Sequence, residues 1–233
     1  GILIAIDPHR IHSFSKRQMI RRMKKSESSA MKLAQTFFCL DADTKQPICF
    51  TTGTAARSVS QATPELLALS TEILKQNEQQ RPLVLADCEH YTQEIIDWIA
   101  TQSPYDILVP VKNKNAIAKQ IEKAFDSFKR HWAGYATTKI SYQMSTSTKG
   151  PYYLFIQRDG EIIKDYIYNA FLCTSNRNEM QDLVFNFPDR WHIEEFFKND
   201  QALGWHRAGT MNLNIQYGRM TMALFAQTSI YMM

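Results

Sequence analysis

With 233 residues, 44% of them hydrophobic, the chain can bury a sizeable core in one large domain or in a domain with an insertion. Its formal net charge is +4, and no apolar run approaches the ~18–20 residues of a membrane span. The N-terminus lacks the pattern of a signal peptide, and the four cysteines form no C-x-x-C motif, so we expect a cytoplasmic protein with reduced thiols and no membrane partner.

Basic residues gather in two segments of the chain. Residues 10–32 contain eight Lys or Arg and one acid, and residues 112–139 contain seven Lys or Arg and two acids. Such segments suit a polyanionic partner, and a pair of solvated surface loops is the alternative. Arg10, Lys112 and Lys114 are the candidates for phosphate contacts.

The first elements are predicted to be strands. Residues 2–6 form an apolar run that ends in Asp7, whereas residues 8–32 are polar and show no clean period. Two β-prone runs, residues 37–40 and 48–51, flank a turn-rich connection. The three runs together predict an antiparallel meander.

A helix and a parallel unit are predicted next. Residues 64–74 have helical spacing, with Thr63 as the expected N-cap. Strand 82–86, helix 92–101 and strand 105–111 then alternate. Strand–helix–strand order predicts two parallel strands joined by a right-handed crossover.

The second half is predicted to contain strands and then helices. A helix over residues 116–128 is followed by three strands, 135–144, 152–158 and 162–173, and then by three helices, 179–185, 188–203 and 213–233. The order predicts an α/β protein with an RNase H-like mixed sheet, in which a three-strand antiparallel meander and parallel strands are flanked by helices. We expect residues 1–130 to form the first part of the core, residues 131–174 an all-β insertion, and residues 175–233 the helical remainder.

Three acidic residues suggest metal chemistry. Asp7 and Asp87 follow apolar strands, and Glu194 lies in a helical pattern far downstream. Carboxylates are hard oxygen ligands of the kind that Mg²⁺ prefers, and two such ions can activate an oxygen nucleophile and neutralise a phosphodiester. The alternative for either aspartate is a purely structural role, as a turn former or an N-cap.

The helix that carries Glu194 presents a charged face. Arg190, Glu194, Lys198 and Gln201 fall on one side of the helix at about 100° per residue. This face can hold a metal ion and nearby phosphates, or it can be an exposed salt-bridge ladder. Glu195 is an alternative functional acid but points about 100° away.

The segment Phe187-x-x-Arg190-x-x-x-Glu194, within the run RWHIEEFFK, resembles the Y-x2-R-x3-E-x6-K signature of DDE transposases from bacterial and archaeal cut-and-paste insertion sequences. The runs ILIAIDPHRI and LVLADCEHY resemble the strands that carry the first two acids of that family. Two positions depart from the signature, because Phe187 stands where the family has Tyr and Gln201 where it has Lys.

The resemblance implies a catalytic triad of Asp7, Asp87 and Glu194 that binds two Mg²⁺ or Mn²⁺ ions. It implies cleavage of transposon ends and strand transfer into target DNA by a homodimer or larger assembly, associated with the nucleoid. Arg190 would contact phosphates near the cleaved end, helped by Lys198 and Gln201. It also implies an N-terminal DNA-binding domain, which this sequence does not include.

Two further residues are singled out, and two other functions stay open. Trp132 is the favoured aromatic for stacking on a flipped base, with a place in the core of the β unit as the alternative. His90 is expected to have a surface or capping role, with substrate contact as the alternative. The rival functions are an inactive or domesticated transposase that binds DNA, and another RNase H-like nuclease.

Overall fold

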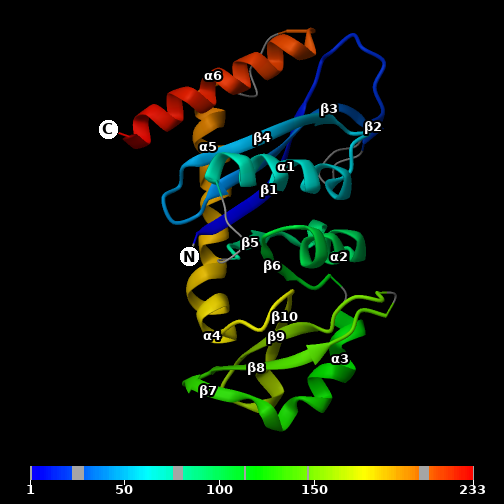
Figure 1. The fold of residues 1–233 in the computed structure, drawn as a ribbon, viewed down its shortest axis with the longest axis vertical. Coiled ribbons are helices and arrows are strands. Elements are labelled where there is room, and N and C mark those ends of the chain that lie inside the picture. Colours follow the sequence, from blue (N-terminus) through cyan, green and yellow to red (C-terminus); the bar gives the residue numbers. More distant parts are fainter. Residues whose placement is uncertain are drawn as a thin grey trace. The chain divides into compact units, whose positions relative to one another are not determined.

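The computed structural model describes residues 2–22, 29–75, 81–112, 114–145, 147–204 and 210–232. The chain forms two compact units, each assembled from two stretches of sequence (Figure 1). Unit 1 consists of residues 1–3 and 76–189, and unit 2 of residues 4–75 and 190–233. The three predicted acids are therefore divided, with Asp87 in unit 1 and Asp7 and Glu194 in unit 2.

The described strands of unit 2 form an antiparallel sheet. They are β1 (Leu3–His12, apart from its first residue), β2 (Arg21–Arg22), β3 (Met31–Asp41) and β4 (Pro47–Thr54). β3 pairs with β1, β2 and β4, in each case antiparallel. The expected meander of three strands is confirmed.

β1 is longer than its apolar run. The strand continues through Pro8, and its pairing with β3 is unbroken from Ile4 opposite Asp41 to His12 opposite Leu33. A proline is tolerated in a strand where the neighbouring strand does not need the missing N–H. The expectations that the strand ends at Asp7 and that residues 8–32 lack a regular element are therefore wrong for β1, β2 and the start of β3.

Different helices cover the two faces of this sheet. Side chains alternate between faces along a strand, so Cys39 and Phe38 of β3 point in opposite directions. The register partner of Cys39 is Cys49, whose thiol donates to the carbonyl of Leu66 in α1 (Val59–Leu74) at 3.5 Å. Phe38 instead meets rings of α5 (Trp191–Ala202). Helix α1 thus lies on one face and α5 on the other.

Helix α1 begins five residues earlier than its spacing suggested. Ser58 caps it, accepting from the amide of Gln61 at 3.2 Å, while the Gln61 side chain accepts from the amide of Ser58 at 3.0 Å. Thr63, the expected N-cap, is instead a buried residue of the helix whose hydroxyl donates to the Val59 carbonyl at 2.8 Å. The reciprocal cap places the start of the helix at Val59, and Pro64 therefore lies inside α1 rather than at its first turn.

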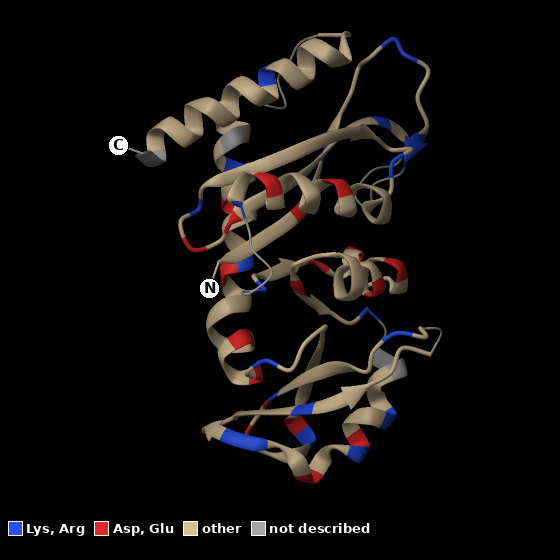
Figure 2. Ribbon diagram, viewed as in Figure 1, with Lys and Arg blue, Asp and Glu red and all other residues tan. Residues whose placement is uncertain are grey.

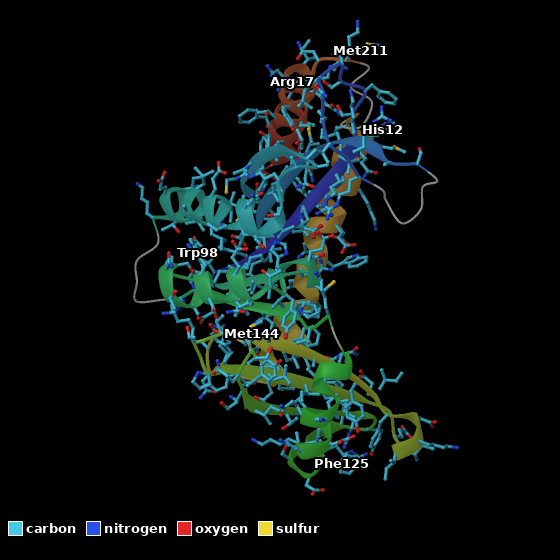
Figure 3. All side chains as sticks on the ribbon, turned by 90° about the vertical axis from the view of Figure 1, so that its right-hand side faces the viewer. His12, Arg17, Trp98, Phe125, Met144 and Met211 are labelled. Carbon is cyan, nitrogen blue, oxygen red and sulfur yellow. The ribbon has the colours of Figure 1, made fainter. Side chains whose placement is uncertain are left out.

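Helix α6 (Leu213–Met232) packs on unit 2 along one side. Its Tyr217 hydroxyl donates to the carbonyl of Gly53 in β4, and the Ser13 hydroxyl donates to Oε1 of Gln216 at 3.1 Å. His12, Arg17 and Met211, which lie near these contacts in the sequence, are labelled in Figure 3. The helix is long and rather apolar, but among the described residues no helix has the length and hydropathy needed to cross a membrane.

Unit 1 begins with the predicted parallel pair. β5 (Leu83–Ala86) and β6 (Asp106–Pro110) run parallel, and α2 (Gln93–Gln102) connects them. Thr92 caps α2, accepting from the amide of Ile95 at 3.4 Å. Trp98 is half-buried on this helix, where Figure 3 labels it.

The sheet of unit 1 continues through four antiparallel strands. After α3 (Lys114–Lys123) come β7 (Lys129–Trp132), β8 (Tyr135–Tyr142), β9 (Tyr152–Asp159) and β10 (Ile167–Cys173), and the spatial order is β5-β6-β10-β9-β8-β7. β10 is antiparallel to β6, so the strands expected as an insertion extend the same sheet. The predicted division at residues 131–174 stays a prediction.

Two boundaries in this region differ from expectation. Helix α3 ends at Lys123 rather than near residue 128, and a 3-10 turn follows in which the Ser127 hydroxyl donates to the Ala124 carbonyl at 2.7 Å. β10 starts at Ile167 rather than residue 162, because the chain turns tightly at Gly160. That glycine has φ +122°, and a Cβ there would lie 2.8 Å from the Asp165 carbonyl oxygen.

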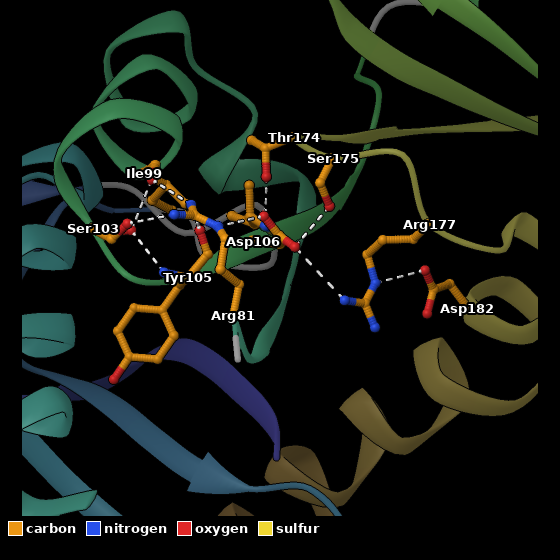
Figure 4. Close-up of polar contacts among 10 residues, drawn as sticks. Arg81, Ile99, Ser103, Tyr105, Asp106, Thr174, Ser175, Arg177 and Asp182 are labelled. Atoms are coloured by element: carbon orange, nitrogen blue, oxygen red, sulfur yellow. Dashed lines mark hydrogen bonds and ion pairs between the residues drawn. The ribbon is translucent and has the colours of Figure 1, made fainter. Parts of the chain in front are cut away.

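A buried charge network braces unit 1 (Figure 4). Asp106, 5% exposed, accepts from Arg81 Nε at 3.0 Å and from the Ser175 hydroxyl at 2.7 Å. Arg177 lies 3.6 Å from the same carboxylate, and its Nε donates to Asp182 at 3.0 Å. Because every buried carboxylate in this network has donors, the network can persist in the core.

Helical turns follow one another from residue 179 to residue 202. They are α4 (Glu179–Gln181), a π-helical turn (Asp182–Asn186), a 3-10 turn (Phe187–Arg190) and α5. The predicted helices 179–185 and 188–203 are confirmed in type and place. Glu194 therefore lies in the first turn of α5, four residues after Arg190.

Candidate active site

Asp7 lies in the middle of β1, on the face of the sheet that α5 covers. Its register partner on β3 is Phe38, and directly opposed side chains of an antiparallel pair share a face. Phe38 is fully buried, and its ring lies 5.5 Å from that of Phe196 and 5.3 Å from that of Phe197. His9, two residues after Asp7 and so on the same face, stacks on Phe197 at 4.4 Å.

Glu194 lies on α5 beside the apolar stripe that faces the sheet. Ile193, Phe196 and Phe197 are buried, and Glu194 is one helical turn before Phe197. Arg190 Nη2 donates to Glu194 Oε1 at 2.8 Å, and the side chain of Glu194 remains 31% exposed. A carboxylate at this edge of the stripe can reach both the sheet and solvent.

Two contacts fix α5 on either side of Glu194. His192 Nδ1 donates to the Ala42 carbonyl at 2.7 Å, which ties the helix to the turn between β3 and β4. Lys45 in the same turn pairs with Glu195 at 3.3 Å. Glu195, the alternative acid, is therefore engaged in a surface ion pair, whereas Glu194 lies toward the Asp7 face. Unit 2 thus brings two of the three predicted acids to one side of its sheet.

Asp87 has a different setting in unit 1. It follows β5 directly and caps a 3-10 turn (Cys88–His90), with its Oδ1 accepting from the amide of Glu89 at 3.0 Å. Nδ1 of His90 lies 2.8 Å from the same oxygen. Asp87 therefore acts as an N-cap, which was the structural alternative for this residue. Its side chain is 27% exposed.

The three-acid site stays a prediction. Within the described residues of either unit, no three His, Cys, Asp or Glu side chains gather as a metal site. Asp7 and Glu194 supply two carboxylates in unit 2, and Asp87 supplies one in unit 1. Each acid offers the hard oxygen donors that Mg²⁺ and Mn²⁺ accept, so the donor chemistry suits these ions.

The residues predicted to contact DNA have varied settings. Lys198 is exposed and lies 5.7 Å from the ring of Trp191, and Gln201 is exposed one turn further on. Lys112 is exposed just after β6, whereas the side chain of Lys114, the first residue of α3, lies outside the described residues. Arg10 is not in a loop but in β1, where its Nε donates to Gln35 at 2.7 Å.

Trp132 lies at the end of β7 and is 46% exposed. Its ring stacks on Tyr135 at 4.4 Å with an 8° angle between the planes. Burial, with the nearby Asp159 carboxylate, raises the pKa of Tyr135 to about 12. Lys129 and Arg130, on the same strand, are exposed basic residues (Figure 2). Tyr152 on β9, by contrast, is buried.

Sequence reasoning missed the setting of His90. A surface or capping role was expected, but the residue is 2% exposed and its ring contacts Asp87, the cap of its turn. The spacing Asp-x-x-His after a strand was the available signal, because an N-capped turn returns the third residue toward the cap. The patterns around Phe38, Phe196 and Phe197 likewise gave no sign that α5 would pack on the face of the sheet that carries Asp7.

Comparison with known proteins decides the family. The model of the transposase DDE domain matches residues 2–228, which is nearly the whole chain. The chain belongs to the transposase DDE domain family. A search of curated proteins found no match. Neither result shows whether this chain belongs to the subgroup of the family with the Y-x2-R-x3-E-x6-K signature, so that assignment stays a prediction.

A solved structure supports the fold of this transposase domain. The chain is similar to a chain in the cryo-EM structure of the piggyBac transposase synaptic complex with hairpin DNA, with a TM-score of 0.55 and 14% sequence identity. The match covers 99% of this chain and 48% of that chain, so this chain spans about half the length of its neighbour. The expected α/β fold, a mixed sheet flanked by helices, is confirmed as that of a transposase catalytic domain.

Proposed function

We propose that this transposase domain cleaves DNA at transposon ends and joins the 3′ ends to target DNA. In this proposal Asp7, Asp87 and Glu194 ligate two Mg²⁺ or Mn²⁺ ions. The family match over residues 2–228 carries the proposal, and the placement of Asp7 and Glu194 on one face of the unit 2 sheet supports it. Bound ions would neutralise the scissile phosphate and activate the attacking oxygen.

The protein's own residues have separate tasks in this proposal. Asp7 is held by strand register, and Glu194 is held by α5 and by Arg190. The guanidinium of Arg190 keeps the carboxylate oriented, and the forked donors of an arginine suit the oxygens of a phosphate group. Gln201 supplies a neutral amide where the Y-R-E-K signature has a charge, and the exposed Lys198, one turn earlier, would partly substitute for that charge.

The proposed DNA contacts are mostly with phosphates. Arg10, Lys112, Lys114, Arg190, Lys198 and Gln201 form this set. Phosphate contacts position DNA without reading its sequence. Each neutralised phosphate makes the slope of log affinity against log salt concentration more negative by about 0.9. We therefore expect this chain to bind duplexes of different sequence alike and to release them steeply as salt rises. Strong discrimination that resists salt would contradict this division of tasks.

Trp132 is proposed to stack on an unpaired base. Its 46% exposure and its ring-on-ring support from Tyr135 leave one aromatic face available at the end of β7. Stacking of this kind contributes about 1–3 kcal/mol per base. In this proposal the segment 131–174, which includes Trp132, contributes to DNA binding. The assembly is proposed to be a homodimer or larger on DNA, at the nucleoid.

Cleavage and strand transfer distinguish the proposal from its rivals. The protein is incubated with a supercoiled plasmid that carries the ends of its element, with Mg²⁺ or with EDTA. We expect metal-dependent cleavage and joined products, both lost in Asp7→Asn, Asp87→Asn and Glu194→Gln. Glu195→Gln is the matched control, because Glu195 only pairs with Lys45 at the surface.

The other outcomes each identify a rival function. Binding of the plasmid without cleavage in Mg²⁺ would favour an inactive or domesticated transposase. Cleavage without joined products would favour another RNase H-like nuclease. Loss of activity in Glu195→Gln but not in Glu194→Gln would show that the acids had been assigned wrongly.

A further inference from the structure

The ring of His90 is buried directly against the proposed metal ligand Asp87. The side chain is 2% exposed, and its Nδ1 lies 2.8 Å from Asp87 Oδ1. An ionised carboxylate only accepts hydrogen bonds, so the Nδ1 of His90 must be the donor in this pair. Asp87 Oδ1 also accepts from the amide of Glu89 at 3.0 Å. Two donors therefore converge on one oxygen of the carboxylate.

The imidazole is not needed to form the turn in which it lies. The amide of His90 donates to the Asp87 carbonyl at 3.1 Å, and the amide of Thr92 donates to the His90 carbonyl at 2.8 Å. The Asp87 side chain also caps the turn through Glu89. These bonds come from the backbone and the cap, so the contact of the ring with Asp87 is an additional constraint on the carboxylate.

We propose that His90 is a positioning residue, which holds the Asp87 carboxylate in the orientation that binds a divalent metal ion. This rests on the proposed function, in which Asp87 is a ligand. A donor on one carboxylate oxygen fixes the torsion of the group and aims the remaining lone pairs, and loss of such partners typically weakens metal binding about 10- to 100-fold.

The test compares two substitutions that separate the donor from the bulk of the ring. His90→Leu keeps the approximate bulk of the side chain but removes the N–H donor. His90→Asn places an amide N–H close to the position of Nδ1. Binding of Mn²⁺ alone to the whole protein is measured by isothermal titration calorimetry, beside wild type and Asp87→Asn. Unfolding in urea without metal, for Asp87→Asn, His90→Leu and the double variant, measures the coupling of the two side chains.

We expect His90→Leu to weaken Mn²⁺ binding about 10- to 100-fold and His90→Asn to restore most of it. Metal-dependent cleavage should follow the same order at low Mn²⁺ and converge at saturating Mn²⁺. If urea unfolding shows that the Asp87 and His90 side chains are coupled in stability, but His90→Leu binds Mn²⁺ like wild type, His90 has only a structural role. That result would overturn the proposal. Failure of His90→Asn to restore binding would overturn the role of the donor.

The proposed function fails in a different way. If Mn²⁺ binds wild type and Asp87→Asn alike, Asp87 is not a ligand, and the triad is wrong together with the role of His90. If binding depends on Asp87 but not on His90, the triad stands and only the positioning role is lost. Circular dichroism of each variant establishes that the comparison concerns folded protein.

Discussion

Asp7 and Asp87 are proposed for the same task, yet the two units hold them by different means. In unit 2, Asp7 is fixed by its pairing with Phe38 and by rings of α5 packed around that strand. In unit 1, Asp87 is fixed by hydrogen bonds from a backbone amide and from His90. Nonpolar packing tolerates little change in shape, whereas a polar turn tolerates any residue that keeps the donor. The two halves of the proposed site should therefore fail under different substitutions.

The largest effect is expected for Phe38→Ala. Phe38 is fully buried between Phe50 on β4 and two rings of α5, and removing a buried phenylalanine costs about 3–5 kcal/mol. The free energy of unfolding in urea gives the change. Phe225→Ala, at a position that is 62% exposed, should stay within about 0.5 kcal/mol of wild type. Equal losses in both variants would show that aromatic packing does not hold α5 on the sheet.

Asp182→Ala probes the polar network of unit 1. Asp182 is 1% exposed and accepts from Arg177 at 3.0 Å and from Asn186 at 2.6 Å. Breaking a buried pair costs about 3–5 kcal/mol, and we expect the lower end because the Arg177 side chain is 30% exposed. Thermal unfolding is compared with the exposed control Asp165→Ala. A loss as small as that of the control would mean that unit 1 is held by its apolar core alone.

Helix caps give a smaller contrast between the units. Ser58 and Gln61 cap α1 reciprocally, whereas Thr92 caps α2 with a single bond at 3.4 Å. Ser58→Ala should cost about 1 kcal/mol, and Thr92→Ala should cost less. Urea unfolding of both variants checks the order. The reverse order would show that the longer Thr92 bond is the stronger cap.

The smallest effect is a pH dependence at Asp97 in unit 1. Burial raises the pKa of this carboxyl, but hydrogen bonds from Tyr152, Ser147 and Gln93 lower the pKa by more than burial raises it. The net shift of the pKa is therefore downward. A lowered folded-state pKa stabilises the fold above about pH 4, and that contribution is lost as pH falls through the folded-state pKa. Asp97→Asn should be less stable than wild type at pH 7, with the difference shrinking in acid. A difference that grows in acid would contradict the downward shift.

Sequence patterns predicted the elements better than their ends. The meander, the parallel pair and the late helices follow from apolar spacing and turn residues, and all are present. The boundaries that failed depend on single contacts, such as the cap at Ser58 and the close approach at Gly160. β1 passed through Pro8 because pairing with β3 outweighed a local signal for an end. Such contacts are set by the folded protein and leave little trace in periodicity.

The sequence proposes a list of acids for the site but not their geometry. Asp7, Asp87 and Glu194 could be selected because strands and a helix precede or carry them. The placement of Asp7 on the side of the sheet that α5 covers depends on the register of Phe38 and on which face of α5 is buried, and neither is encoded in a local motif. The contact of His90 with Asp87 was hidden because a histidine in a polar turn is more often exposed.

Binding of Mn²⁺ to four variants tests the central claim most directly. Asp7→Asn, Asp87→Asn and Glu194→Gln are compared by calorimetry with Glu195→Gln, which alters only the surface pair with Lys45. If the three acids share a metal centre, each of the first three variants should lose at least the ~10-fold affinity that a lost outer partner costs, and Glu195→Gln should bind like wild type. Wild-type affinity in any of the first three variants would show that its acid is not a ligand and would contradict the proposed centre.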